Sequence, residues 1–147
     1  MSSQSLTALT AHQKRLIRQS FDSIQDYSDS VVLLFYGRLF ELEPATRHLF
    51  KISIREQARK LMDTLSTMVA ALDHFDELLP FLTELGRRHV GYGVQPENYE
   101  TLRSALLWAM GQALGVEFDR DTRAAWESLL TAISAVMLEA AAQKAGP

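Results

Sequence analysis

The chain has 147 residues, of which 47% are hydrophobic and 22% charged, with a formal net charge of −3. This length and composition predict a single globular domain over residues 1–147 and exclude an intrinsically disordered chain. The slightly acidic balance and the lack of a basic patch argue against a nucleic-acid partner. Because the sequence contains no cysteine, disulfides, zinc–thiolate sites, iron–sulfur clusters and thiol catalysis are also excluded.

The N-terminal segment and the apolar runs carry no targeting signal. Residues Met1–Thr10 are polar and lack the basic region and apolar run of a signal peptide. The longest apolar run, Val31–Tyr36, is far too short to span a bilayer. We therefore expect a cytoplasmic protein without a membrane partner, with segments 1–9 and 142–147 frayed.

Apolar residues recur at helical spacing along most of the chain, between residues that start and end helices. The predicted starts are Thr10 with Gln13, Pro44, Ser53 with Glu56, Pro80 (which opens or kinks its helix), Pro96, and Asp119 or Asp121. The predicted ends are Gly91, Gly93 and Gly115, because glycine adopts positive φ. The inward positions are Leu16, Ile17, Phe21, Ile24, Val31, Leu34, Phe35, Leu39, Leu42, Leu49, Phe50, Leu61, Leu65, Met68, Leu72, Tyr99, Leu102, Leu106, Met110, Leu114, Trp126, Leu129, Ile133, Val136 and Met137. Strand-type alternation is absent, so the sequence predicts an all-α fold of six to eight helices.

His89 is the first candidate ligand. It shares one helical face with Leu78, Leu82 and Leu85 and is followed by two glycines. A histidine at the end of an apolar stripe is either a core residue hydrogen-bonded inward or a metal ligand. A neutral imidazole is a good axial ligand for haem iron.

Two polar residues fall at apolar positions. Gln57 lies on the stripe of Leu61 and Leu65, and Tyr36 lies within the most apolar stretch. A buried amide or phenol needs a hydrogen-bond partner. The alternatives are a solvated glutamine at a helix start, a core tyrosine bonded to a backbone carbonyl and, for Phe50, an ordinary core aromatic.

Taken together, these residues resemble a globin from about Leu16 to Met137. Leu34–Pro44 with Leu49–Phe50 resembles the second and third helices of single-domain globins, and Gln57–Met62 resembles the start of the distal helix. Leu85–His89 resembles the proximal helix, and Arg123–Trp126 resembles the start of the last helix. The chain most resembles bacterial single-domain globins of the flavohaemoglobin lineage, of the thermoglobin and Hell's Gate globin kind. Neuroglobin is similar over the same segments.

The resemblance implies a globin fold around haem b (iron protoporphyrin IX), with His89 as the iron ligand. On the distal side, it implies Tyr36 and Gln57 over the sixth iron position and Leu61 beside the gas ligand. It also implies that Phe50 packs on the haem face and that Leu85 and Val94 lie against the porphyrin. Tyr99 would lie near the proximal imidazole. Lys60 and Arg88 would pair with the propionates, the alternative being ordinary exposed helix cations.

The implied function is reversible binding of oxygen and other diatomic gases, including CO and NO, for storage, transport or scavenging. Oxygen on ferrous iron gains negative charge, so neutral donors at Tyr36 and Gln57 would stabilise it by roughly 1.5–3 kcal/mol each. Glutamine is also a poorer iron ligand than imidazole. We therefore expect the sixth position to be open to external ligands.

Two departures from the flavohaemoglobin pattern matter. Where that family has a glutamate bonded to the proximal imidazole, this chain has Ala141, with Glu139 on another face, so we expect a weak electronic push from His89. No flavin or nicotinamide domain follows, so NO dioxygenation would need a separate reductase. An NO dioxygenase is therefore the first alternative function, and a gas sensor and a haem-free regulator are the others. The presence of His89, Phe50, Tyr36 and Gln57 argues against the haem-free regulator.

Overall fold

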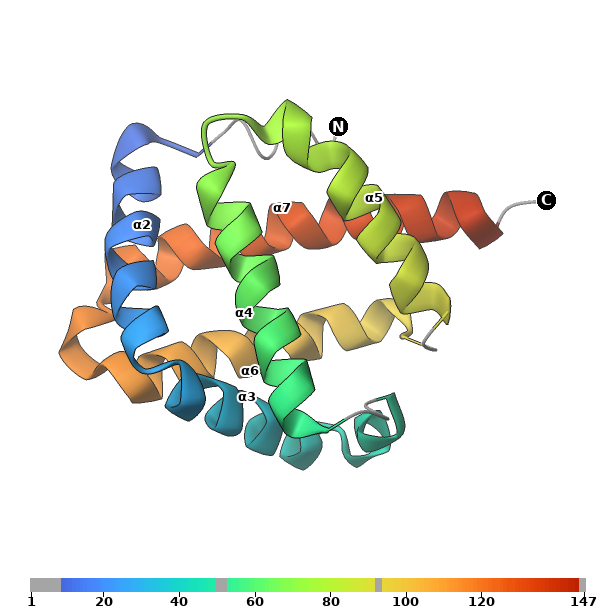
Figure 1. Cartoon of the computed structure of the whole chain (residues 1–147), viewed down its shortest axis with the longest axis horizontal. Coiled ribbons are helices and arrows are strands. Elements are labelled where there is room, and N and C mark those ends of the chain that lie inside the picture. The colour runs from blue at the N-terminus through green and yellow to red at the C-terminus, as the bar shows by residue number, and fades with distance from the viewer. Residues whose placement is uncertain (1–8, 50–52, 92–93, 146–147) are drawn as a thin grey trace.

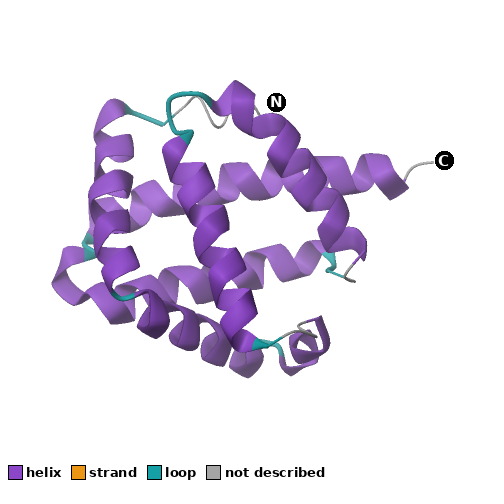
Figure 2. Ribbon diagram, viewed as in Figure 1, coloured by secondary structure: helices purple, strands orange, loops and turns teal. Residues whose placement is uncertain are grey.

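The computed structural model describes residues 9–49, 53–91 and 94–145. These residues form helices joined by short connections, without a strand among them (Figure 2). The elements are α2 (Ala11–Asp26), α3 (Ser28–Leu42), the 3-10 helix η1 (Pro44–Leu49), α4 (Ile54–Ala70), α5 (Phe75–Gly91), α6 (Pro96–Leu114), the 3-10 helix η2 (Gly115–Glu117) and α7 (Arg120–Ala145). The predicted all-α fold is confirmed.

The helices form two crossing layers. Figure 1 shows α2, α4 and α5 running across α6 and α7, with α3 along the lower edge. Residue contacts join α5 to α7, α3 to α6 and α2 to α7. The apolar stripes predicted from the sequence therefore face each other across these crossings.

Most of the predicted helix boundaries are confirmed by their caps. Thr10 and Gln13 form the reciprocal capping box, with both backbone-to-side-chain bonds 3.0 Å long. The Ser53 hydroxyl accepts from the Glu56 backbone N–H, and the Asp119 carboxylate accepts from that of Thr122. These side chains satisfy N–H groups that a helix start leaves without a partner. Gly115, with φ +58°, follows the last residue of α6.

Two local expectations differ from the structure. Pro80 lies inside α5 and does not open it, because the helix already begins at Phe75. Leu42 is exposed, because α3 ends there and the chain turns into η1. Helix α7 continues through Ala145, and the fraying expected for segments 1–9 and 142–147 stays a prediction.

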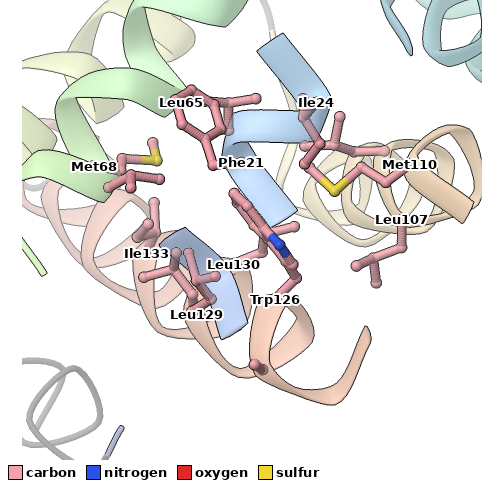
Figure 3. Packing of buried hydrophobic residues seen from close by; sticks show 14 of the residues in the cluster. Phe21, Ile24, Leu65, Met68, Leu107, Met110, Trp126, Leu129, Leu130 and Ile133 are labelled. Atoms are coloured by element: carbon pink, nitrogen blue, oxygen red, sulfur yellow. The ribbon is translucent and has the colours of Figure 1, made fainter. Parts of the chain in front are cut away.

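Buried apolar side chains from α2, α4, α6 and α7 pack together around Trp126 (Figure 3). Trp126 is fully buried, its ring lies 6.4 Å from that of Phe21, and its Nε1 donates to the Ser20 hydroxyl over 2.8 Å. Helix α7 is long and apolar enough to span a membrane, but more than half of its apolar window is buried inside this fold. Its composition is therefore explained by its place in the core.

Candidate functional site

His89 lies in the last turn of α5, half-buried. Its Nδ1 donates to the Leu85 carbonyl oxygen over 2.8 Å. Burial lowers the pKa of His89, and the bond to Leu85 opposes this shift in part. The imidazole is therefore neutral at physiological pH, and the Nδ1–H bond leaves the lone pair on Nε2, as a metal ligand requires.

Tyr99 lies beside this imidazole, on α6. The two ring centroids are 6.2 Å apart, and Tyr99 is only 5% exposed. Its hydroxyl is buried without a hydrogen-bond partner among the residues that the structure describes, and burial raises the pKa of Tyr99. An unpartnered buried hydroxyl costs about 1–3 kcal/mol, so this one is suited to a bound group or water that supplies a partner.

The start of α6 is held in place by Glu43, which follows α3. Its carboxylate accepts from Asn98 Nδ2 over 2.7 Å and from the Thr101 hydroxyl over 2.6 Å. Because Tyr99 lies between these two donors in the chain, the contact fixes the backbone that carries it. Sequence reasoning missed this group, since the residues are far apart in the chain and exposed carboxylates are common.

Tyr36 lies on α3 and is 4% exposed. Its ring packs against Phe35, at 4.8 Å, and stacks on Phe40, at 6.0 Å. Burial raises the pKa of Tyr36 well above its usual range. The hydroxyl therefore stays protonated and can act as a neutral hydrogen-bond donor.

The remaining predicted residues lie on α4, on α5 and just before α6. Gln57 and Leu61 are half-buried in the first turns of α4, and Lys60 is exposed. Arg88 has a side chain that is 61% exposed and lies 3.7 Å from Glu84. The exposure of both cations fits the simpler reading of surface helix residues. Phe50 lies outside the described residues, so its predicted place on the haem face remains a prediction.

The structure brings one group of these residues together. Leu85, His89, Tyr99 and Val94 meet where α5 ends and α6 begins, and the Val94 N–H donates to the His89 carbonyl over 3.0 Å. Tyr36 comes from α3 and Gln57 from the start of α4, two helices that contact each other. The candidate residues thus lie on or next to α3, α4, α5 and α6, whose arrangement Figure 1 shows.

These residues fit a haem group. The imidazole offers a lone pair on Nε2, and the Tyr99 hydroxyl lacks a partner within the described part of the chain. Leu61, Leu85 and Val94 are partly buried apolar side chains that pack against the core. A flat apolar cofactor needs such a ligand and such walls. Ala141 is half-buried and Glu139 is exposed. The acceptor at Nδ1 is the neutral carbonyl oxygen of Leu85.

Comparison with known proteins agrees with this geometry. The globin family model matches residues 33–137. A neuroglobin from Tetraodon nigroviridis is 29% identical over 143 residues, covering 88% of this chain and 90% of its own. A flavohemoprotein from Halalkalibacterium halodurans is 24% identical over 138 residues, covering 92% of this chain but only 34% of its own length.

Solved structures share the fold. An engineered carbene transferase derived from a putative nitric oxide dioxygenase of Rhodothermus marinus has a TM-score of 0.84 at 24% identity, covering 94% of this chain and 96% of its own. A bacterial globin from Campylobacter jejuni has a TM-score of 0.81 at 20% identity, covering 92% of this chain and 99% of its own. With the family model spanning most of the sequence, the chain belongs to the globin family, whose members bind haem and gaseous ligands.

Proposed function

We propose that this globin binds haem b through His89 and reversibly binds oxygen, for storage, transport or scavenging, with CO and NO as further ligands. The observation that carries the proposal is the bond from His89 Nδ1 to the Leu85 carbonyl. It leaves Nε2 as the ligand atom of an imidazole that burial keeps neutral. When haem is bound, its iron supplies the gas binding and the redox chemistry.

The distal side of this proposal rests on two neutral donors. Tyr36 keeps its proton because burial raises its pKa, and the amide of Gln57 has no titratable proton at physiological pH. Both would donate to a gas ligand that carries partial negative charge, and Leu61, one turn after Gln57, would supply an apolar wall. A hydrogen bond to a charged acceptor contributes about 1.5–3 kcal/mol, which favours retention of oxygen over uncharged ligands.

The proximal side supports a binding protein more than an oxygen-activating enzyme. A neutral carbonyl oxygen at Nδ1–H makes a weaker hydrogen bond than a carboxylate would, and it therefore raises the basicity of the imidazole less. His89 would therefore remain a weakly donating ligand, in line with Ala141 in place of a glutamate.

NO dioxygenation is the second candidate. Two similar proteins are described as a flavohemoprotein and as a derivative of a putative nitric oxide dioxygenase. Tyr36 and Gln57 would serve that reaction as well, and its turnover would need electrons from a separate reductase in the cytoplasm. A gas-sensing role would instead require a transmitter partner.

The decisive experiment is an absorption series on the purified protein in ferric, deoxy-ferrous, oxygenated and CO-bound forms, with His89→Gly alongside. We expect bound haem, a five-coordinate deoxy form and a stable oxygenated form in the wild type. We expect haem loss in the variant, reversed by free imidazole. A wild-type protein that binds no haem, or a variant with an unchanged deoxy spectrum, would refute the proposal.

A second assay separates the two candidate functions. NO consumption by the oxygenated protein is measured with and without an added flavin reductase and NADH. Consumption of one equivalent of NO, with only slow further consumption when the reductase and NADH are present, supports an oxygen-binding protein. Sustained catalytic consumption with the reductase supports the dioxygenase.

A further inference from the structure

Helices α5 and α7 approach each other closely at Gly86. A Cβ atom at this position would lie 2.5 Å from the Met137 carbonyl oxygen and 3.0 Å from its Cα. Real Cβ atoms essentially never make contacts below 3.0 Å. Both obstructing atoms belong to the backbone of α7, so no side-chain rotation can relieve the clash. This crossing, visible in Figure 1, therefore requires glycine.

The same peptide unit holds the imidazole of His89. The Leu85 carbonyl that accepts from His89 Nδ1 belongs to the planar peptide joining Leu85 to Gly86. His89 lies three residues beyond Gly86, within one helical turn. Any movement of α5 away from α7 at Gly86 must therefore carry both the imidazole and its hydrogen-bond acceptor with it.

We propose that Gly86 is a positioning residue for the iron ligand, an inference that rests on the proposed role of His89. Its close contact with Met137 sets how deeply α5 lies on α7, and so fixes the imidazole relative to Tyr99 on α6. A methyl group at Gly86 needs about 1 Å more space to reach an ordinary van der Waals contact of 3.4 Å or more. His89 would be displaced by a similar amount.

The experiment uses Gly86→Ala in the haem-loaded protein, with Gly37→Ala and Gly111→Ala as matched controls. All three glycines are helical, so each substitution raises helix propensity. A Cβ at Gly37 meets nothing within 4 Å, and one at Gly111 meets only Phe118 Cδ2 at 3.6 Å. The controls therefore add a methyl group without moving a backbone.

Two readouts are measured. The first is the iron–imidazole stretching band of the ferrous protein, followed by resonance Raman spectroscopy. The second is the rate of haem transfer to an excess of apomyoglobin. We expect Gly86→Ala to shift and broaden the band and to weaken haem retention by roughly 10- to 100-fold, the range seen when ligand orientation is lost. The controls should leave both unchanged.

A second background tests whether the effect passes through His89. In His89→Gly loaded with haem and free imidazole, the ligand is not attached to α5. If Gly86 acts through His89, adding Gly86→Ala to this background leaves the iron–imidazole band where it was. An equal shift in both backgrounds, or a wild-type band in Gly86→Ala itself, overturns the proposal.

Failure of the proposed function remains distinguishable. If His89→Gly keeps the wild-type band without added imidazole, then His89 is not the ligand, whatever Gly86→Ala does. If Gly86→Ala alone does not fold, it is placed in the Gly37→Ala/Gly111→Ala background and compared with that double variant. Failure to fold there as well, judged by circular dichroism of the haem-free protein, would show a role in folding alone and overturn the proposal.

Discussion

Replacing Tyr36 with phenylalanine tests the distal half of the proposed site. The substitution keeps the ring, which packs between Phe35 and Phe40, and removes only the hydroxyl. If that hydroxyl donates to bound oxygen, Tyr36→Phe should speed oxygen dissociation. The reason is that a neutral donor stabilises the negative charge of the bound gas and is lost without a change in packing.

The burial of Tyr36 sets the size of the expected effect. At 4% exposure the hydroxyl lies in a low-dielectric interior, where a hydrogen bond to a charged acceptor is little screened. Such bonds contribute about 1.5–3 kcal/mol, which corresponds to roughly a 10- to 140-fold faster dissociation. Because burial keeps Tyr36 protonated, the effect should not change between about pH 6 and pH 9.

The assay is stopped-flow dissociation of oxygen and of CO from the wild type, Tyr36→Phe, Gln57→Leu and the double variant. CO carries little charge when bound, so its dissociation should change far less than that of oxygen. The two donors share one acceptor, and their effects should therefore be coupled in a double-mutant cycle.

Two results would refute this reasoning. Equal acceleration of oxygen and CO release would mean that Tyr36 blocks the exit path sterically and donates no bond. Unchanged oxygen release in Tyr36→Phe would place the hydroxyl outside the pocket and leave Gln57 as the distal donor.

Three further tests concern the proximal ligand, the stability of the haem-free protein at acidic pH, and a hydrogen bond in the core. His89→Gly should lose haem and regain it with free imidazole, as absorption spectra would report; retention without imidazole contradicts the assignment. Burial lowers the pKa of His89 in the folded protein, whereas in the unfolded chain this pKa is about 6.5. Just below about pH 6.5, His89 therefore binds a proton in the unfolded chain that it does not bind in the folded one. The haem-free protein should therefore lose stability as pH falls through that value, by at most about 1.4 kcal/mol per pH unit, and His89→Gly should lack this component in urea titrations. Ser20→Ala leaves the buried Nε1 of Trp126 without its acceptor and should cost about 1–3 kcal/mol of unfolding free energy; the cost should shrink in a Trp126→Phe background.

The helices could be predicted from the sequence because their signals are local. A capping box such as Thr10 with Gln13 and a terminator such as Gly115 act within one turn, and both appear where predicted. Pro80 shows the limit of this reasoning. A proline early in a helix removes one backbone donor, and tertiary packing lets the helix begin five residues before it.

The candidate site depends on contacts that no local pattern encodes. His89 stood out because an imidazole at the end of an apolar stripe is unusual, but its acceptor is a backbone carbonyl, a group that every residue carries. The anchor at Glu43 joins side chains 55 and 58 residues apart. The tight crossing at Gly86 depends on the backbone of another helix, so the sequence shows only a glycine within a helix.

The corner at the far end of α6 has a practical consequence. Val116, directly after Gly115, is 96% exposed, and the chain contains no cysteine. A cysteine introduced there would be the sole thiol, at a position about 25 Å along the helix axis from Tyr99, given a rise of about 1.5 Å per residue. A fluorophore attached to it would be quenched by energy transfer to haem, and its brightness would report cofactor occupancy in real time without touching the gas-binding side of the protein.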